Sequence, residues 1–232
     1  MNPPGAGSGL SIVMPVLDEA AGLAAALAPL QPLRAAGQAE LIVADGGSGD
    51  GSAALARPWA DRVVDVPRGR ARQMNAGAAA AHAGTLLFLH ADTRLPADAL
   101  PAIQAALEAG AAWGRFDVAI DGRPWMLRVV AALMNLRSRL SGIATGDQAI
   151  FVTRAAFDAV GGFPDQPLME DVELSRRLKR AVGPPACLRE RVLTSGRRWE
   201  QCGVWRTIVL MWRLRWAYWR GAAPDELARR YR

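Results

Sequence analysis

Metal-binding side chains are scarce in this sequence. Cys187 and Cys202 are the only cysteines, and His82 and His90 are the only histidines. Two cysteines cannot form a disulfide framework or a four-ligand zinc site, and two histidines exclude a histidine-rich metal centre. Any bound metal is therefore expected to have carboxylate and phosphate oxygen ligands, which Mg²⁺ and Mn²⁺ prefer.

Long hydrophobic runs are also missing, although 51% of the 232 residues are hydrophobic. No stretch of about 18 uncharged apolar residues is present that would span a membrane. The segment Met1 to Gly9 lacks the basic region and the apolar core of a signal peptide. We therefore expect a cytoplasmic protein with one compact α/β domain.

Lysine is nearly absent, because Lys179 is the only one and arginine carries almost all of the positive charge behind a net charge of +6. Arginine binds phosphate through two parallel hydrogen bonds. Because the arginines are dispersed and acidic residues lie between them, we expect no nucleic-acid partner. A phosphorylated small substrate or an anionic membrane surface accounts for the charge.

Short apolar runs alternate with alanine-rich segments in the first hundred residues, which predicts parallel strands with crossover helices. The predicted strands are 10–16, 40–44, 62–66 and 85–89, and the predicted helices are 18–30, 52–57 and 72–83. Further along, helices are predicted at 97–109, 126–140, 171–180 and 204–220, and strands at 113–120 and 149–153.

The apolar run that begins at Leu86 ends abruptly in a carboxylate, Asp92. Runs of this length are typical of strands buried on both faces, and such strands carry their chemistry beyond their carboxyl ends. Asp92 is therefore a candidate ligand for a metal or a substrate. The alternative is that Asp92, with Thr93, caps a following helix.

The glycine-rich loop from Asp45 to Ser52 joins a predicted strand to a predicted helix. Its glycines allow positive φ angles and a close backbone approach to an anion, although any tight turn needs glycine. The loop matches neither the P-loop pattern nor the dinucleotide fingerprint. Asp45, at the end of the strand, can accept a hydrogen bond from a base or a ribose.

Two basic segments are candidate anion sites. Arg68 to Gly77 holds three arginines that precede or open a helix, and Ser195 to Trp199 holds paired arginines on a predicted loop. Either segment suits a diphosphate, and either is equally typical of a solvated basic surface.

Adjacent carboxylates, Glu170 and Asp171, lead into a predicted helix. They fit plain helix capping, and they also fit a general base whose pKa is tuned by its surroundings. The polar turn from Gly146 to Gln148 precedes a predicted strand and is a candidate binding site for a sugar or an acceptor.

The order of these motifs resembles that of the family 2 glycosyltransferases with the GT-A fold. The segments that carry this resemblance are Ser11–Val16, Asp45–Ser52, Asn75–Gly77, His90–Asp92 and Glu170–Asp171. More closely, the chain resembles a bacterial branch associated with radical-SAM/selenodomain genes and arsenosugar biosynthesis. The segments that carry this second resemblance are Gly69–Asn75, Phe88–Thr93, Gly146–Gln148, Leu168–Asp171 and Arg197–Trp199.

The family resemblance implies a single GT-A domain over residues 1–232, built on one Rossmann-like, mostly parallel sheet with flanking helices. Within it, we expect residues 10–96 to bind the nucleotide sugar and residues 97–203 to bind the acceptor. Residues 204–232 are expected to form a C-terminal helical segment.

The resemblance also implies the transfer of a sugar from a nucleotide-diphosphate sugar to a small-molecule or lipid acceptor, with inversion. Asp171 would be the base with Glu170 beside it, Asp92 would hold Mn²⁺ or Mg²⁺, and Asp45 would bind the nucleobase. The residues implied for the donor site are Pro15, Val16, Glu19, Asp45, Gly47, Ser48, Arg72, Asn75, Gly77, Ala91, Arg197, Arg198 and Trp199. The residues implied for the acceptor are Gly146, Asp147 and Gln148.

One position departs from the family pattern. Many family members carry two aspartates, in the pattern Asp-x-Asp, at the strand that binds the metal. Here His90 occupies the first position, so Asp92 is expected to be the one protein carboxylate on the metal. One carboxylate suffices where water and phosphate complete the coordination, as is common for Mg²⁺.

Two other functions fit parts of the pattern. A non-catalytic nucleotide-sugar-binding protein would not need Asp45, Asp92 and Asp171 together. A nucleotidyltransferase would carry its glycine-rich loop, with Lys or Arg, after the first strand, where this chain has Pro15 to Glu19.

The predicted C-terminal helix combines tryptophan with arginine. Trp205, Trp212 and Trp219 recur every seven residues, and an arginine follows each of them. This periodicity gives one aromatic stripe beside one cationic stripe. The helix either docks on the domain or at a homodimer contact, or it lies on a membrane surface.

Overall fold

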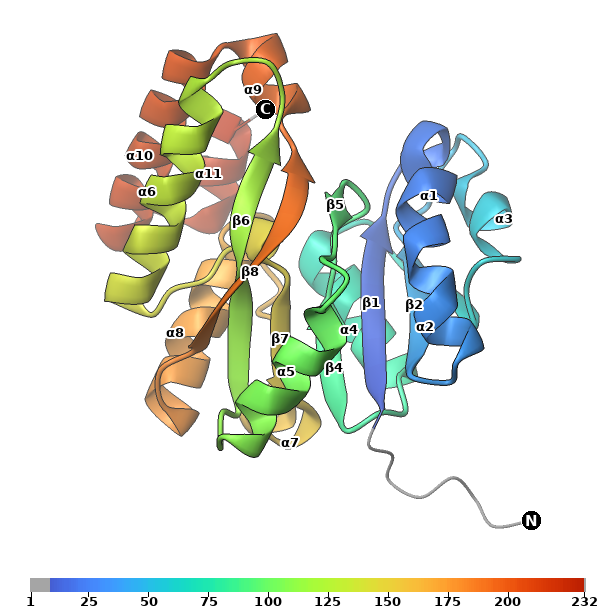
Figure 1. The fold of residues 1–232 in the computed structure, drawn as a ribbon. Coiled ribbons are helices and arrows are strands. Elements are labelled where there is room, and N and C mark those ends of the chain that lie inside the picture. Colours follow the sequence, from blue (N-terminus) through green and yellow to red (C-terminus); the bar gives the residue numbers. More distant parts are fainter. Residues whose placement is uncertain (1–8, 232) are drawn as a thin grey trace, which may run out of the picture.

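The computed structural model describes residues 9–231, so most of the segment Met1 to Gly9 lies outside the described residues. One eight-stranded sheet runs through the molecule in the spatial order β3-β2-β1-β4-β7-β6-β8-β5 (Figure 1). Its strands are β1 Leu10–Val16, β2 Ala39–Asp45, β3 Arg62–Asp65, β4 Thr85–Phe88, β5 Thr93–Arg94, β6 Trp113–Asp121, β7 Ile150–Thr153 and β8 Ala186–Ser195.

Helices cover both faces of this sheet (Figure 1). They are α1 Ala20–Leu27, α2 Gln31–Ala35, α3 Ser52–Ala56, α4 Arg70–Ala80, α5 Ala99–Glu108, α6 Met126–Ser141, α7 Arg154–Ala159, α8 Glu170–Val182, α9 Arg197–Cys202, α10 Val204–Trp219 and α11 Pro224–Tyr231. Among residues 9–231, no helix is long and apolar enough to cross a membrane.

Strand direction differs between the two parts of the sheet. In the first part, β1 pairs in parallel with β2 and β4, and β2 pairs in parallel with β3. In the second part, β7 is antiparallel to both β4 and β6, while β8 is parallel to β6. The parallel part brings the carboxyl ends of β1, β2 and β4 to one edge, and Val16 lies beside Asp45 there. The fold is therefore the expected mixed α/β architecture on a single sheet.

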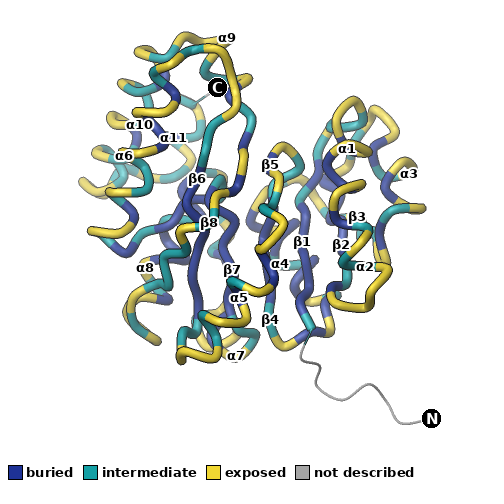
Figure 2. The backbone as a smooth tube through the Cα atoms, viewed as in Figure 1, coloured by how far each residue is buried: buried dark blue, intermediate teal, exposed yellow. Residues whose placement is uncertain are grey.

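The core lies on both faces of the central strands, whose backbone is the most deeply buried in the molecule (Figure 2). Ile12 and Met14 of β1 pack on the face covered by α1 and α5, whereas Val13 packs on the opposite face against α4. Because side chains alternate across a strand, burial of both faces explains the uninterrupted apolar runs in the sequence. Gly77 lets α4 approach closely, since a Cβ there would lie 2.3 Å from Val13 Cγ1.

Several predicted boundaries are wrong. The helix predicted over 18–30 is divided into α1, a 3₁₀ turn at Ala28–Leu30, and α2. Pro29 and Pro32 lack the N–H that a continuous helix needs. The helix predicted over 72–83 begins at Arg70 and ends at Ala80.

The remaining corrections concern the second half of the chain. The arginines predicted on a loop after Ser195 lie instead in the short helix α9. Strand β8 and helix α11 were not predicted. In β8, only Val192 and Thr194 are buried, so its apolar pattern is too weak to identify a strand.

Candidate active site

The glycine-rich loop after β2 is held in shape by its own aspartate. Asp45 is 3% exposed. Its Oδ2 accepts hydrogen bonds from the N–H groups of Gly47 (3.0 Å) and Ser48 (2.9 Å). This carboxylate therefore organises the loop, a role that the sequence did not indicate. Contact between Asp45 and a nucleobase stays a prediction.

The same loop is fastened to the turn that follows β1. The N–H of Asp18 donates to Ser48 Oγ at 2.9 Å, and the N–H of Glu19 donates to Ser52 Oγ at 3.0 Å. Gln73 of α4 donates from Nε2 to the carbonyl oxygens of Val16 (2.7 Å) and Ala44 (2.9 Å). Pro15, Val16, Glu19, Gly47 and Ser48 are thus brought together at one edge of the sheet.

The predicted donor-site residues of α4 make structural contacts to a distant loop. Asn75 donates from Nδ2 to the carbonyl of Phe163 (2.8 Å) and accepts from its N–H (2.9 Å). Arg72 forms an ion pair with Asp165, with 2.8 Å between Nε and Oδ1. Helix α4 therefore anchors the loop that leads into α8, and donor contacts from Arg72, Asn75 and Gly77 stay predictions.

Asp92 lies in a turn directly after β4, and its side chain is exposed. The helix-cap alternative is wrong, because the following helix α5 begins at Ala99 with Asp98 at its N-cap. The turn is held by its backbone, since the N–H of Ser195 donates to the carbonyl of Asp92 at 3.0 Å. The neighbouring Ala91 lies in the same turn, half-buried.

Asp92 by itself supplies only part of the ligand set that a hard divalent cation needs. Among residues 9–231, no three His, Cys, Asp or Glu side chains come together to hold a metal. An exposed carboxylate that lacks protein co-ligands suits Mg²⁺ or Mn²⁺, which take their remaining ligands from water and phosphate. The residues present therefore fit a metal that arrives with a diphosphate.

The histidine that departs from the family pattern contacts the polar turn before β7. His90 Nδ1 lies 3.7 Å from Asp147 Oδ1. Burial works to raise the pKa of Asp147, but His90, Arg70 and Arg137 outweigh it and lower that pKa below its usual value. The ring also requires glycine at position 146, because a Cβ there would lie 2.4 Å from His90 Cε1.

Gln148, the last residue of that turn, is fully buried. Its Oε1 accepts from the N–H of Thr145 at 3.2 Å, and its Nε2 donates to Asn135 Oδ1 at 3.4 Å. The side chain therefore shapes the turn, and its contact with an acceptor stays a prediction.

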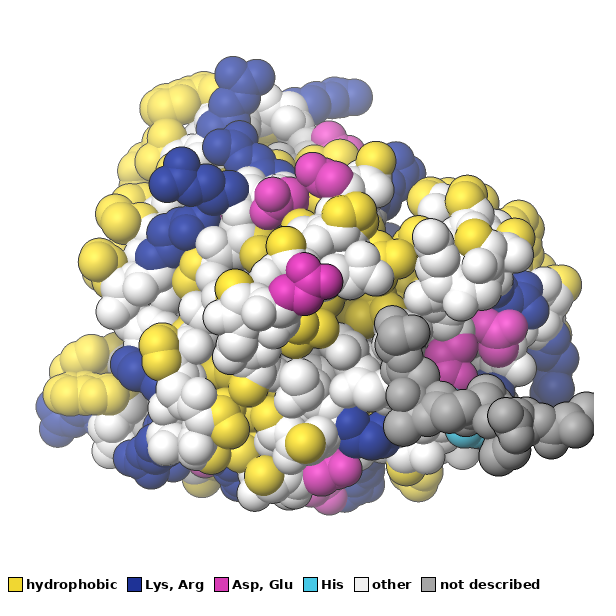
Figure 3. Space-filling model, turned by 60° about the horizontal axis from the view of Figure 1, so that its bottom comes forward, with side chains coloured by type: hydrophobic (Ala, Val, Ile, Leu, Met, Phe, Trp, Pro, Cys, Tyr) yellow, Lys and Arg dark blue, Asp and Glu magenta, His cyan; other side chains and the backbone are white. Residues whose placement is uncertain are grey.

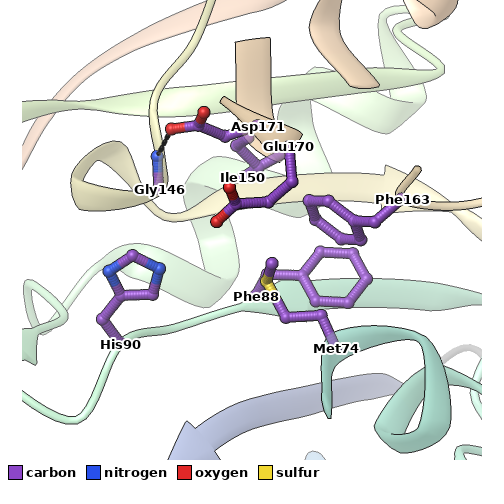
Figure 4. A pocket seen from close by; sticks show the side chains of 8 residues that line it. All are labelled: Met74, Phe88, His90, Gly146, Ile150, Phe163, Glu170 and Asp171. Carbon is purple, nitrogen blue, oxygen red and sulfur yellow. Dashed lines mark hydrogen bonds between the residues drawn. The ribbon is translucent and has the colours of Figure 1, made fainter. Parts of the chain in front are cut away.

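Glu170 and Asp171 open α8 and line a pocket with His90 and Gly146 (Figure 4). The N–H of Gly146 donates to Asp171 Oδ2 at 2.8 Å, and the N–H of Val172 donates to Asp171 Oδ1 at 2.7 Å. The Glu170 carboxylate is 4% exposed and points into the pocket toward His90. Strand-end and helix-start residues far apart in the sequence thus meet at one cavity.

The two carboxylates of this pocket differ in their electrostatic surroundings. Burial, followed by the negative charge of Glu170, raises the pKa of Asp171 to about 6. Arg70 Nη1 lies 3.5 Å from Glu170 Oε1. A carboxylate with a pKa near 6 is largely ionised at neutral pH and still accepts a proton readily, as a general base must.

Arg137 of α6 is a functional candidate that the sequence did not reveal. Its Nε and Nη2 atoms are buried and have no hydrogen-bond partner among the described residues. Burial lowers the pKa of Arg137, and the nearby charges of Asp171 and Asp147 act in the opposite direction. A buried guanidinium without partners is costly, so its position beside Asp171 points to a ligand group that it receives.

The paired arginines of α9 face two different elements. Arg197 Nη2 lies 3.7 Å from Glu19 Oε2, so α9 reaches the donor-side turn. Arg198 stacks on the ring of Tyr231, with 3.7 Å from Cζ to the ring centroid, and donates to the Tyr231 carbonyl at 2.9 Å. Trp199 lines a second pocket at the start of α6, away from these contacts.

Comparison with known proteins identifies the family of the chain. The family model described as glycosyl transferase family 2 matches residues 11–159. Uncharacterized glycosyltransferases of Mycobacterium bovis and Mycobacterium tuberculosis are 32% identical over 137 residues, which cover 58% of this chain and 61% of theirs. The match thus spans less than two thirds of these relatives' length.

Solved structures share the fold. A mannosyltransferase from Pyrobaculum calidifontis, in complex with GDP-Man and Mn²⁺, has a TM-score of 0.66 at 18% identity, over 96% of this chain and 68% of its own. Glucosyl-3-phosphoglycerate synthase from Mycobacterium tuberculosis, in complex with Mn²⁺, UDP and glucosyl-3-phosphoglycerate, has a TM-score of 0.58 at 19% identity, over 80% and 70%. With the motifs, the sheet topology and the family match in agreement, the chain belongs to glycosyltransferase family 2.

Proposed function

We propose that the protein is a divalent-metal-dependent, inverting glycosyltransferase that moves a sugar from a nucleotide-diphosphate sugar to an acceptor hydroxyl. The observation that carries the proposal is Asp171, a half-buried carboxylate with a pKa of about 6 on the wall of a pocket at the sheet edge. The nucleotides and Mn²⁺ bound to the similar solved structures support the donor class and the metal.

The donor lies along the edge formed by β1 and β2. The loop after β2 is pre-shaped by Asp45, so it meets the nucleotide without first having to order the chain. Asp92 would hold the metal, and the donor's diphosphate would supply further ligands. A bound divalent ion offsets the negative charge that builds on the departing diphosphate.

Asp171 takes the proton of the acceptor hydroxyl as that oxygen attacks the anomeric carbon from the face opposite the diphosphate. The N–H groups of Gly146 and Val172 orient the carboxylate. Glu170 keeps it basic by adding a second negative charge nearby. The bond from the anomeric carbon to the diphosphate breaks as the new glycosidic bond forms.

The acceptor carries an anionic group close to its reacting hydroxyl. Arg137 supports this part of the proposal, because its buried Nε and Nη2 lack partners beside the base. Arg70, which is half-exposed and lies 3.5 Å from Glu170 Oε1, adds a second positive charge nearby. The acceptor is a small molecule or a lipid with such a group.

The motifs from Gly69 to Trp199 support membership of the radical-SAM/selenodomain-associated branch.

A two-step experiment tests the proposal. Thermal shifts with UDP-, GDP- and dTDP-sugars, each with and without Mn²⁺, identify the donor by metal-dependent stabilisation. Release of the nucleoside diphosphate is then measured for the wild type and for Asp171→Asn. If no nucleotide stabilises the protein, the donor site is wrong. Donor binding with equal, negligible turnover in both proteins would indicate a non-catalytic binding protein instead.

A further inference from the structure

Two helices expose apolar stripes that the glycosyl-transfer proposal does not use. On α6 and its N-cap, the exposed large hydrophobic residues are Trp125, Val129, Leu133, Leu136 and Leu140. On α10 they are Trp205, Val209, Trp212, Trp216 and Trp219. Both sets recur at three- or four-residue intervals, so each forms one continuous face of its helix.

These stripes are not the faces by which the helices attach to the domain. Helix α6 buries Leu127, Val130 and Ala131, and helix α10 buries Thr207 and Leu214. Leu214 packs with Leu227 of α11 and with Met169, next to the start of α8. Within residues 9–231, the tryptophans of α10 therefore remain largely uncovered, and Trp219 is 81% exposed.

The two stripes lie on the same side of the molecule. The segments at which the two helices begin line one pocket, which is formed in part by Pro124, Glu200 and Val204. From there both helices run along the same edge (Figure 1). Hydrophobic side chains gather along that edge, with Lys and Arg side chains next to them (Figure 3). Exposed apolar surface of this extent is unusual on a protein without a partner.

The charge beside the stripes has one sign. Neither α6 nor α10 contains an acidic residue. Arg128 is exposed on α6, as are Arg206 and Arg213 on α10, and Arg220 stacks on the Trp216 ring at 4.8 Å. Arg139 of α6 is instead paired with Asp117, with 2.7 Å between Nη2 and Oδ2. Tryptophan with arginine is the combination that binds the headgroup region of a bilayer, where apolar rings enter and cations meet lipid phosphates.

We propose that the α6–α10 face, meaning these ten hydrophobic side chains and the four arginines Arg128, Arg206, Arg213 and Arg220, binds the surface of an anionic lipid bilayer. A second copy of the chain is disfavoured as the occupant. A two-fold contact would place this face against itself, so arginines would meet arginines without an acidic residue on either helix to pair with them. Anionic lipid supplies the missing opposite charge.

Flotation with vesicles tests the proposal on the full chain. We expect the protein to float with vesicles of phosphatidylcholine and phosphatidylglycerol, and to bind about tenfold less to phosphatidylcholine alone or in high salt. The double variant Trp212→Gln/Leu136→Gln should lose at least about tenfold of the binding. The matched control is Leu55→Gln/Val182→Gln, which changes exposed hydrophobic residues elsewhere and should bind as the wild type does.

Two readouts keep the outcomes distinct. Donor-induced thermal shifts should be equal in all three proteins, which shows that the variants fold and that failure here leaves the transferase proposal untouched. The inference is overturned if the protein does not float, if both double variants bind equally, or if light scattering shows a dimer that only Trp212→Gln/Leu136→Gln abolishes while vesicle binding is absent.

Discussion

We call the region at the ends of β1 and β2 the donor edge, and the pocket lined by Glu170 and Asp171 the acceptor pocket. The two regions lie on the same sheet but differ in how completely their charged groups are paired. At the donor edge, Asp45, Ser48 and Ser52 are satisfied by hydrogen bonds within two adjoining loops. At the acceptor pocket, Asp171 stands beside a second carboxylate, and Arg137 has buried nitrogens without partners.

Backbone strain occurs in both regions, because Asp18 at the donor edge also has a left-handed φ of 53°. Ala149 (φ 47°) ends the turn before β7, and Met169 (φ 66°) precedes α8, so non-glycine residues with left-handed φ flank the acceptor pocket. Such conformations cost free energy and persist where the surrounding structure holds them. The loops of the donor edge are ordered by internal hydrogen bonds, whereas the acceptor pocket holds unfavourable electrostatics that the proposed acceptor would relieve.

The largest expected effect comes from removing the base. Asp171→Asn should lower turnover by about 10³-fold, because a positioned general base contributes 10²–10⁴-fold. Metal-dependent donor binding, which belongs to the other region, should be retained in thermal shifts. The control is Asp158→Asn, an exposed aspartate of α7 that should leave turnover unchanged. Normal turnover in Asp171→Asn would show that the base is elsewhere.

Loss of the metal ligand should affect the donor edge alone. Asp92→Ala is expected to weaken Mn²⁺-dependent donor binding by about 10–100-fold, an effect of the size seen when metal-site residues are lost. The measurement is donor titration with and without Mn²⁺. Asp98→Ala, an exposed aspartate in the same loop region whose side chain makes no cap bond, is the matched control. Equal donor affinity in the two variants would exclude Asp92 as the ligand.

Substitutions in the two regions should change the free energy of unfolding in different directions. Ser52→Ala removes a fully buried hydroxyl that accepts from the Glu19 N–H, so it should lower the free energy of unfolding by about 1–2 kcal/mol. Arg137→Met removes two buried nitrogens, Nε and Nη2, that lack partners among the described residues. It should leave that free energy unchanged or raise it by about 1 kcal/mol, while turnover falls. Urea unfolding measures both. Equal destabilisation by the two changes would contradict the comparison.

The smallest expected effect is a shift in the pH profile. Asp171 must be ionised to act as a base, so kcat/KM should rise with pH through a limb near pH 6. Glu170→Gln removes a negative charge that disfavours ionisation of Asp171, which lowers its pKa and should move the limb to lower pH. Glu108→Gln, an exposed change on α5, should leave the limb in place. A limb that stays near 6 in Glu170→Gln would show that burial alone sets this pKa.

Local sequence patterns predicted the structure correctly where a single segment of the chain determines it. The apolar runs predicted β1, β2 and β4, and the abrupt change to Asp45 and Asp92 predicted polar strand ends. They were insufficient where a strand is half-exposed, as in β8, or where a carboxylate has two uses. Asp45 fits both nucleobase binding and loop closure, and its hydrogen bonds became visible only in the folded loop.

By itself, the sequence determined the α/β alternation, the family, and the carboxylates available for chemistry, because strand periodicity, glycine turns and motif order are local or linear properties. Tertiary structure decided the rest. It brought Gly146 to Asp171 and buried Arg137 beside them. It also left the tryptophans of α10 uncovered. Periodicity shows that a helix face is apolar, but whether that face is covered depends on elements far away in the chain.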